Sequence, residues 1–315
     1  MKILDFDKIK SLNLSAEEMY SWTENVWKQQ DSFILPPKSK MLQGESGRYF
    51  TMPCVLPQYD ISGVKFICRN VDDVDGVPAR NSNIMLQNCS KHGLLAVMDG
   101  TYITNMRTGA NAAYNAITFA KSKPETLAVY GLGLTARAFM FFFTAIFKHP
   151  ITIKLMRYKN QAELFIDKFK SNPNLKFQIC DNLEELFHSD IIVSCVSFAR
   201  KELCDVSVYP KGCTVVPVHT SGFQNCDLAF DKVVVDDIGH VKSYRYFNEF
   251  QDRMIRITDV ANQRVAGREN DEQQIVVYDG GVAIHDLYYA MKILEKAGDD
   301  CIQIPMSYPE ERFWI

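Results

Sequence analysis

The chain has 315 residues, of which 47% are hydrophobic, so it can bury one large core or two medium ones. Its 35 basic and 38 acidic residues are mixed along the sequence, and the net charge of −3 argues against a nucleic-acid partner, because such proteins usually carry a basic stripe. The longest apolar run, residues 139–147, is far shorter than the roughly 20 residues of a membrane helix, and acids interrupt the N-terminus where a signal peptide would be apolar.

The nine cysteines are odd in number, include no CxxC pair, and in several cases lie inside apolar runs. This pattern is typical of reduced, buried thiols in the cytosol rather than of disulfides or a zinc site. The histidines are scattered, and the acids of residues 72–76 lack the alternating spacing of a calcium loop. We therefore expect a soluble, cytoplasmic protein without a structural metal.

The first part of the chain predicts short strands and two helices. Ser15 and the acids that follow it indicate the capped start of a helix, and a second helix is predicted over residues 104–120. Residues 34–47 are rich in Pro, Gly, Ser and Lys and predict a loop. Strand-like runs joined by polar turns, typical of an antiparallel or mixed sheet, cover residues 2–5, 49–52, 63–68, 83–87 and 94–98.

From residue 126 onward, strands and helices alternate. The predicted strands are residues 126–130, 151–156, 176–180, 190–197, 214–220, 232–237 and 274–278, and the helices are 131–149, 161–171, 183–188 and 282–296. The runs 191–196 and 233–235 are continuously apolar, as expected of strands buried on both faces of a parallel sheet. The pattern predicts an α/β fold with a Rossmann-type doubly wound parallel sheet and a second, mixed-sheet α+β domain, divided near residue 115.

A glycine-rich turn joins the first of these strands to its helix. It has the sequence Gly131-Leu132-Gly133-Leu134-Thr135-Ala136, a GxGxxA pattern. Gly131 allows a tight turn, Gly133 lets a diphosphate approach the main chain, and Ala136 is small enough for the helix to pack on the strand. The N–H groups of the helix N-terminus, at Leu134 and Thr135, then face the phosphates. The context favours a nicotinamide dinucleotide, and the alternative is a flavodoxin-like turn that holds no ligand.

The residues after the second strand of this region bear on the choice of dinucleotide. An NAD site usually has Asp or Glu there for the ribose hydroxyls, whereas this chain has Arg157 and Lys159. A guanidinium fits a 2′-phosphate in shape and charge, so the two cations favour NADP(H) over NAD(H). The alternative is that both are solvated loop residues.

Two runs carry a resemblance to a known family. One is the glycine turn, and the other is Met98-Asp99-Gly100-Thr101-Tyr102-Ile103-Thr104-Asn105-Met106-Arg107-Thr108-Gly109-Ala110. Together they resemble the ornithine cyclodeaminase/μ-crystallin family, and Gly63 to Lys65, Asn81 and Asp286 fit the same pattern over nearly the whole chain. The resemblance implies a homodimer. It also implies that residues 1–115, completed by 290–315, form the substrate-binding and dimerisation domain, and that 116–289 bind the dinucleotide.

The resemblance further implies that Arg48, Lys65 and Arg107 surround the carboxylate of the substrate. Lys65 lies in an apolar strand, where a lysine is seldom buried without a partner or a function; the alternative is the exposed face of an edge strand. Arg107 opens the predicted helix, where a cation opposes the helix dipole unless an anionic ligand recruits it; the alternative is an exposed arginine. The assignment of Arg48 rests mostly on the family.

One position departs from the family pattern. Ornithine cyclodeaminase has a catalytic aspartate after the strand that corresponds to residues 214–218, and the matching residue here is His219. Because imidazole titrates near neutral pH and can pass a proton to an imine or amine, His219 is a candidate acid/base. The alternative is a histidine satisfied at a strand end. The change puts cyclodeamination in doubt but leaves hydride transfer intact.

We therefore predict an NAD(P)-dependent amino-acid dehydrogenase or imine reductase, in which hydride passes between the nicotinamide and the α-carbon of a small amino or imino acid. Two alternatives stay open. An ornithine cyclodeaminase would form proline and ammonia while recycling its NAD. A dinucleotide-binding protein of the μ-crystallin type would bind without turnover, although a pure binder has no need of the three cations.

Overall fold

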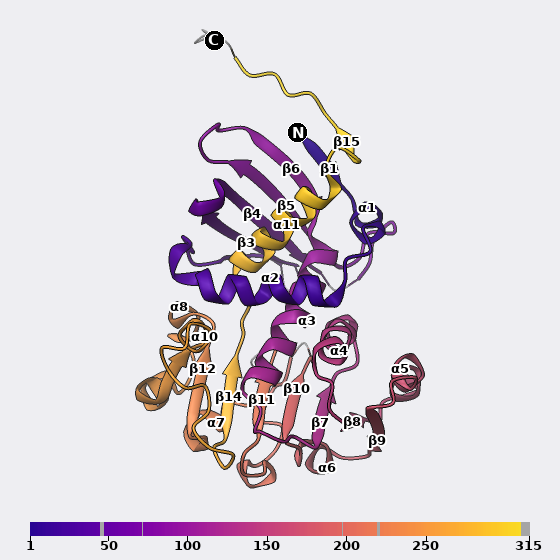
Figure 1. Cartoon of the computed structure of the whole chain (residues 1–315), viewed down its shortest axis with the longest axis vertical. Helices are drawn as coiled ribbons and strands as arrows, with labels where there is room; N and C mark the ends of the chain where they lie inside the picture. The colour runs from indigo at the N-terminus through magenta and orange to yellow at the C-terminus, as the bar shows by residue number, and fades with distance from the viewer. Residues whose placement is uncertain (45–46, 71, 197, 219–220, 310–315) are drawn as a thin grey trace. The chain divides into compact units, whose positions relative to one another are not determined.

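The computed structural model describes residues 1–44, 47–70, 72–196, 198–218 and 221–309. The chain divides into two compact units, whose helices and strands are labelled in Figure 1. Unit 1 consists of Met1–Leu14, Ser32–Thr104 and Ala283–Ile315, and unit 2 consists of Ser15–Asp31 and Asn105–Val282. Within the described ranges, no helix is both long enough and apolar enough to cross a membrane.

Unit 1 is built on a seven-stranded mixed sheet with the order β15-β1-β6-β5-β4-β3-β2. β1 and β6 pair in parallel, and the other neighbours are antiparallel. The helix α11, Ala283–Ala297, lies across β3, β4 and β5, and α1, Phe6–Ser11, lies beside β6 (Figure 1). The strands are β1 Lys2–Leu4, β2 Ser39–Gln43, β3 Gly47–Leu56, β4 Ile61–Arg69, β5 Arg80–Asn88, β6 Leu94–Asp99 and β15 Ile302–Gln303.

The prediction of a loop over residues 34–47 is wrong for Ser39–Gln43, which form β2. All five residues of this strand are exposed, and it lies at the edge of the sheet, where Met41 pairs with Tyr49 of β3. A strand with no buried face needs no alternation of apolar and polar residues, so the pattern that reveals other strands is missing here. β2 forms because its main chain hydrogen-bonds to the part of β3 that extends beyond the hydrophobic core.

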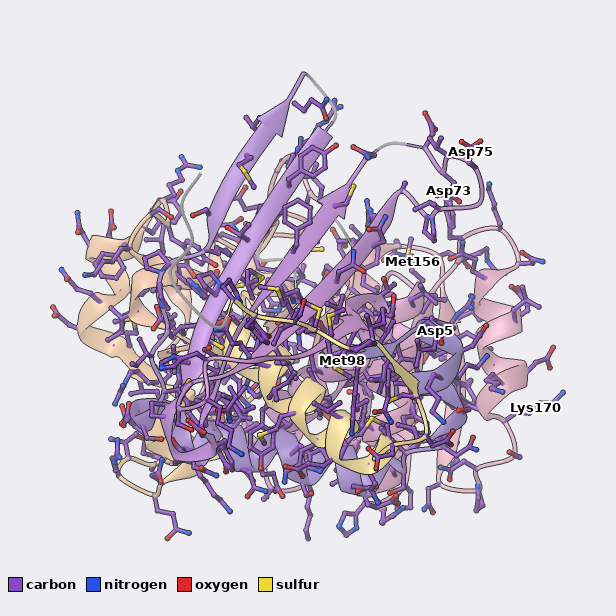
Figure 2. All side chains as sticks on the ribbon, turned by 90° about the horizontal axis from the view of Figure 1, so that it is seen from above. Asp5, Asp73, Asp75, Met98, Met156 and Lys170 are labelled. Carbon is purple, nitrogen blue, oxygen red and sulfur yellow. The ribbon has the colours of Figure 1, made fainter. Side chains whose placement is uncertain are left out.

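The acids of residues 72–76 lie in the connection between β4 and β5, where Figure 2 labels Asp73 and Asp75. The carboxylate of Asp73 accepts the N–H of Ala79 at 2.7 Å, and Asp75 has a left-handed φ of 49°. Aspartate is common in such turns because its short side chain bonds to nearby main chain and tolerates this conformation. These two acids therefore shape the turn.

Unit 2 contains an eight-stranded sheet with the order β13-β12-β14-β11-β10-β7-β8-β9, and all its described neighbours pair in parallel. The chain runs outward from β7 through β8 to β9 and then returns to the other side of β7 with β10. This is the strand order of a Rossmann fold, with its switch point between β7 and β10. The predicted fold class, a Rossmann-type parallel sheet and a mixed-sheet α+β unit, is confirmed. The strands are β7 Thr126–Tyr130, β8 Ile151–Met156, β9 Leu175–Cys180, β10 Ile191–Ser194, β11 Thr214–Pro217, β12 Lys232–Val235, β13 Met254–Arg256 and β14 Ile275–Tyr278.

Helices of unit 2 surround this sheet. The central strands β10, β11, β12 and β14 are buried along their whole length, as their continuous apolar runs predict. The helices are α2 Ala16–Gln29, the greater part of α3 Gly100–Thr118, α4 Leu134–Ile146, α5 Gln161–Phe169, α6 Leu183–Phe187, α7 Cys226–Ala229, α8 Ile238–Val241, α9 Phe247–Phe250 and α10 Ile257–Ala261.

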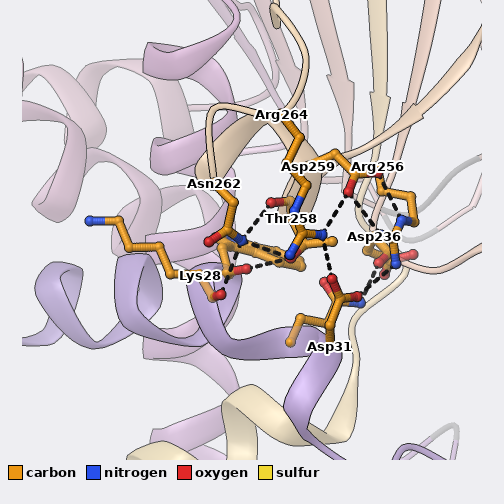
Figure 3. A network of polar contacts seen from close by, with 10 residues as sticks. Lys28, Asp31, Asp236, Arg256, Thr258, Asp259, Asn262 and Arg264 are labelled. Carbon is orange, nitrogen blue, oxygen red and sulfur yellow. Dashed lines mark hydrogen bonds and ion pairs between the residues drawn. The ribbon is translucent and has the colours of Figure 1, made fainter.

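The division into units differs from the expected domains at residues 15–31, which lie in unit 2. Ser15 caps α2 as predicted, accepting the N–H of Glu18 at 3.1 Å. At the other end of the helix, Thr258 donates its hydroxyl to the carbonyl of Trp27 at 2.7 Å, and Asn262 donates its amide to the carbonyl of Lys28 at 3.0 Å. The last carbonyls of a helix lack intrahelical donors, so α10 and the residue after it satisfy α2 in the folded chain (Figure 3).

Ion pairs strengthen this attachment. Asp31, just after α2, contacts Arg256 at 2.8 Å and Arg264 at 2.5 Å, and both arginines also contact Asp259 (Figure 3). The sequence of residues 15–31 alone does not reveal these ion pairs or the hydrogen bonds from α10, so it could not predict that this segment belongs to unit 2. The other boundaries fall after Thr104 and before Ala283 rather than near 115 and 290, because α3 packs on α4 while α11 packs on the mixed sheet.

Candidate active site

The glycine turn after β7 has the geometry that its sequence predicts. Gly131 has a φ of +85°, and a Cβ atom there would lie 2.8 Å from the main-chain nitrogen of Val196, just beyond β10. Only glycine combines this left-handed conformation with so close an approach. The turn therefore passes directly against the end of the neighbouring strand, at the switch point of the sheet.

The N-terminus of α4 is open at the second glycine. Gly133 is the N-cap, no side chain caps the first N–H groups of the helix, and a Cβ at this position would meet nothing within 4 Å. Ala136, by contrast, is fully buried, which keeps the helix close to the sheet. An uncapped helix N-terminus beside open space suits a diphosphate, because N–H groups and the helix dipole both favour an anion there.

Arg157 and Lys159 follow β8, as predicted, but Arg157 has acidic neighbours. Its Nε donates to Asp181 at 2.5 Å, and its Nη1 lies 3.6 Å from Glu163. Asp181 follows β9, so the acid comes from the next strand rather than from the end of β8. Lys159 has a left-handed φ of 49°, and its ammonium lies 5.6 Å from the ring centre of Tyr158. The sequence analysis missed Asp181 because it reads as part of the cap of a helix.

Lys65 is fully buried on β4, a central strand of unit 1, which excludes the alternative of an exposed lysine on an edge strand. Its Nζ lies 2.6 Å from Oδ2 of Asp286, which α11 contributes and which is also fully buried. In the sheet, Lys65 is paired with Met52 of β3 and Ile84 of β5, both buried. The carboxylate of Asp286 thus compensates an ammonium held in apolar surroundings, a role that the sequence analysis did not foresee.

Cys54 lies close enough to this ion pair to feel both charges. Burial raises the pKa of its thiol, the charge of Asp286 raises it further, and the charge of Lys65 lowers it. The net effect is a thiol that stays protonated at neutral pH. Because a thiolate is the reactive form of cysteine, Cys54 acts here as an apolar neighbour rather than as a nucleophile.

Arg48 lies on the same face of the mixed sheet as Lys65. It is exposed at the start of β3, and side chains four residues apart along a strand point the same way, so Arg48 shares a face with Met52, the partner of Lys65. At ~3.3 Å per residue, the two Cα positions on β3 are separated by roughly 13 Å. The long side chains of Arg48 and Lys65 are thus on one surface, at different distances along it.

Arg107 does not open a helix, so that prediction is wrong. Asp99 accepts the N–H of Tyr102 at 2.8 Å and starts α3 at Gly100, which places Arg107 well inside the helix. The side chain is only 6% exposed, which also excludes the alternative of a solvated arginine. Its guanidinium packs on Gly281 of the same unit: a Cβ on this glycine, whose φ is +80°, would lie 2.8 Å from Nη1.

Two buried aspartates accompany Arg107 in unit 2. Asp236 follows β12 and Asp279 follows β14, and both accept the N–H of Gly281, at 3.0 Å and 3.2 Å. Burial and the negative charge of Asp236 raise the pKa of Asp279, and the positive charge of Arg107 opposes this shift. Asp236, Asp279 and Gly281 were all missed as candidates.

The candidate acid/base His219 lies outside the described residues. Of the other predicted residues, the structure groups the glycine turn with the N-terminus of α4 in unit 2, and places Arg48 and Lys65 on one face of the sheet in unit 1. Arg107 has its own acidic surroundings in unit 2.

Comparisons with known proteins agree with this architecture. The alanine dehydrogenase of Archaeoglobus fulgidus is 25% identical over 315 residues, covering 94% of each chain. A solved archaeal alanine dehydrogenase dimer with bound NAD has a TM-score of 0.85 at 21% identity, covering 98% of this chain and 99% of that one. The Δ1-pyrroline-2-carboxylate reductase of Thermococcus litoralis, solved with NADH and L-proline, has a TM-score of 0.85 at 19% identity, covering 96% and 100%.

The parallel sheet with its glycine turn and the separate mixed sheet place the chain in the broad class of Rossmann-type proteins with a second α+β unit. The family model described as ornithine cyclodeaminase/mu-crystallin matches residues 2–300. The chain therefore belongs to this family, and the resemblance seen in the sequence is confirmed.

The Lys65–Asp286 pair predicts a large effect on stability when one partner is removed. Asp286→Ala leaves the buried ammonium without its carboxylate and should lower the free energy of unfolding by about 3–5 kcal/mol. Urea denaturation measures this. The control is the double variant Lys65→Met/Asp286→Leu, which removes both charges at similar volume and should stay close to the wild type. Equal urea midpoints for Asp286→Ala and the wild type would show that the ion pair does not keep Lys65 in the core.

Proposed function

We propose that this chain is an NAD(P)-dependent oxidoreductase that transfers hydride to or from the α-carbon of an amino acid or its imine. The observation that carries the proposal is the uncapped N-terminus of α4 behind a glycine turn at the switch point of the sheet. Family membership supports it, as do similar structures, one solved with NAD and one with NADH and L-proline.

The proposed cofactor-binding site is formed by main-chain groups. The N–H groups of Leu134, Thr135 and Ala136 would hold the diphosphate, and Gly131 and Gly133 leave room for it. When bound, the nicotinamide ring supplies the carbon that accepts or releases hydride. The chain's own contribution is to fix the position and charge of the groups around the reaction.

Three cations are proposed to bind the substrate. Arg48 and Arg107 would bind the substrate carboxylate, and Lys65 would stabilise charge at the carboxylate or nitrogen, or relay a proton. Asp286 holds the Lys65 ammonium at 2.6 Å and so fixes the direction of the remaining N–H donors. Burial of the pair excludes water and strengthens its electrostatic effect on a bound substrate. His219 remains the proposed acid/base.

A substitution at Gly133 tests the cofactor site without damaging the fold. Gly133→Asp places a carboxylate in open space at an N-cap, where aspartate stabilises a helix, so the melting temperature should hold or rise. The same carboxylate repels and displaces a diphosphate, so NAD(H) and NADP(H) should bind about 100-fold more weakly or worse. Calorimetric titration measures this, with Gly133→Ala as the control that adds bulk without charge. Unchanged binding in Gly133→Asp would rule out the proposed cofactor site.

Turnover then separates the candidate functions. The wild type should oxidise NADH or NADPH, followed at 340 nm, when given Δ1-pyrroline-2-carboxylate or a 2-oxo acid with an amine. A flat trace with ornithine while proline forms would instead indicate a cyclodeaminase. Tight dinucleotide binding without turnover of any of these substrates would indicate a binding protein and contradict the proposal.

For the cofactor we propose a preference for NADP(H), because Arg157 directly follows β8, where an NAD site usually has an acid instead. Asp181 competes for its guanidinium, so Asp181→Asn should bind NADPH about tenfold more tightly, and Arg157→Leu about tenfold more weakly. NADH affinity should change little in either variant. Lys170→Leu, which removes an exposed, ion-paired cation from the end of α5, is the control (Figure 2). Equal effects on NADPH and NADH would contradict the role of Arg157.

We further propose a homodimer formed through the outer face of the mixed sheet of unit 1. Phe66 and Met85 are each 40% exposed on the face opposite Lys65, and the ring of Tyr49 stacks on Phe66 at 6.1 Å. A contiguous apolar sheet face of this kind marks an interface, and a twofold axis lets it pair with itself. The similar archaeal alanine dehydrogenase is described as a dimer.

The dimer proposal is tested by a charge in the middle of this face. Phe66→Glu should shift the protein from dimer to monomer in light scattering after size exclusion. Leu164→Glu, which alters an apolar side chain of unit 2 that is 56% exposed, should leave the dimer intact. A dimeric Phe66→Glu variant, or a monomeric wild type, would contradict the proposed interface.

A further inference from the structure

We propose that Asp236, Asp279 and Gly281 position Arg107, and that the affinity of Arg107 for a substrate carboxylate is coupled to a proton held by Asp279. The inference rests on the proposed function, since it takes Arg107 to bind the carboxylate of the substrate. It concerns residues of unit 2 alone and assigns a role to groups that no step so far has used.

The first observation is the contact between Arg107 and Gly281. With φ of +80°, Gly281 has the conformation that side chains avoid, and a Cβ would lie 2.8 Å and 3.1 Å from the two Nη atoms of Arg107. The guanidinium therefore packs on bare main chain, and glycine is needed for both conformation and space. The preceding Gly280 lacks this constraint: its Cβ would meet only ordinary contacts, 3.7 Å from Asp236 and 3.8 Å from His240.

The second observation is the pair of acids that hydrogen-bond to this turn. Oδ2 of Asp236 and Oδ1 of Asp279 accept the same N–H of Gly281, at 3.0 Å and 3.2 Å, and both residues are buried. Asn115, two turns after Arg107 on the same side of α3, donates to the other oxygen of Asp279 at 3.3 Å. The carboxylates thus determine where the main chain under the guanidinium lies.

The charges of the cluster do not balance without a proton. Arg107 carries one positive charge beside two aspartates. The imidazole of His240 of α8, whose Nδ1 lies 3.4 Å from Asp236, adds a second positive charge only when it is protonated. Neutral groups also donate to the two acids: Asn115 to Asp279, the Gly281 N–H to both, and the Asp237 N–H to Asp236, while the amide of Gln30 donates to the carbonyl of Asp236 at 2.7 Å. Burial and the negative charge of Asp236 both disfavour the ionised form of Asp279 and raise its pKa.

The sign of the coupling follows from this balance. With one proton on the pair, Arg107 and the remaining carboxylate compensate each other, and a substrate carboxylate adds a single negative charge. Without that proton the cluster is already negative and opposes the substrate. Affinity for the carboxylate should therefore fall as pH rises and Asp279 loses its proton, and substrate binding should take up a proton in that range.

Two variants change this behaviour in opposite ways. Asp279→Asn is neutral at every pH and keeps an oxygen that can accept the Gly281 N–H, so KM should stay at its low-pH value as pH rises. Gly281→Ala displaces the guanidinium, so KM should rise about tenfold or more at every pH, with a smaller change in kcat. A role limited to folding would lower stability in both variants without separating KM from kcat in this way.

Each variant has a matched control. Gly280→Ala alters the neighbouring glycine, which has room for a Cβ, and should keep the wild-type KM. Asp227→Asn alters another fully buried aspartate of the same unit, whose pKa burial raises to about 7 and which accepts the hydroxyl of Tyr278 at 2.6 Å. It should change stability in a similar way while keeping the wild-type dependence of KM on pH.

The measurements are KM and kcat between about pH 6 and 9, where imine substrates and the pair can both be followed, and calorimetry with pyrrole-2-carboxylate. This probe resembles a cyclic imino acid but accepts no hydride, and titration in two buffers of different ionisation enthalpy counts the protons taken up. Proton uptake is expected in the wild type and Asp227→Asn, and not in Asp279→Asn. A pH dependence of KM in Asp279→Asn equal to that of the wild type, or a Gly281→Ala variant that behaves like Gly280→Ala, overturns the inference.

A substrate-free measurement separates this inference from the proposed function. In protein labelled with ¹⁵N-arginine, the Nε signal of Arg107, assigned by its loss in Arg107→Lys, should shift as the aspartates titrate in the wild type and not in Asp279→Asn. If the signal shifts but no carboxylate binds, the proposed function fails and the positioning of Arg107 stands. If the signal does not shift, the inference fails even in an active enzyme.

Discussion

In a parallel sheet every strand ends at the same edge, and this constraint determines where the chemistry of unit 2 is located. Gly131 follows β7, Arg157 follows β8, and Asp236 and Asp279 follow β12 and β14. These residues span about half of the sequence, yet the sheet places them along one edge. The close approach of Gly131 to Val196, beyond β10, shows how tightly neighbouring strand ends are packed there. An anion site made of main chain and a cluster of charged side chains can therefore share one surface of the unit.

A different constraint applies in unit 1, because one face of its mixed sheet must be shielded from water. α11 covers it, and its burial brings Asp286 to Lys65 from 221 residues away. The fold and the candidate chemistry are joined at this contact, since the helix that completes the core also supplies the carboxylate that makes a buried ammonium tolerable. Removing both charges preserves the packing and removes the chemistry, whereas removing one endangers both.

Short sequence patterns predicted those strands whose bounds depend on neighbouring residues alone. Residues 126–130 and 151–156 form β7 and β8 with the expected bounds, because glycine, proline and polar residues flank short apolar runs. The start of α3 was placed too late because Asp99 was not recognised as its cap. β2 was missed because an edge strand with no buried face has no alternation. The acidic partners Asp181, Asp236, Asp279 and Asp286 could not be assigned, since each becomes a partner only when distant strands or helices are brought together.

The buried cations Lys65 and Arg107 are compensated in different ways, and the difference bears on the proposed function. Lys65 has a carboxylate at 2.6 Å, so that pair is neutral as it stands and fixes the direction of the lysine donor. Arg107 has two aspartates and a main-chain surface that they determine, so with a neutral His240 imidazole its cluster is neutral only when one acid carries a proton. A site that needs a proton to be neutral responds to any further charge brought near it. For the proposed enzyme, which would bind a carboxylate and move hydride and protons at the adjacent carbon and nitrogen, Lys65 would supply a fixed charge and Arg107 an adjustable one.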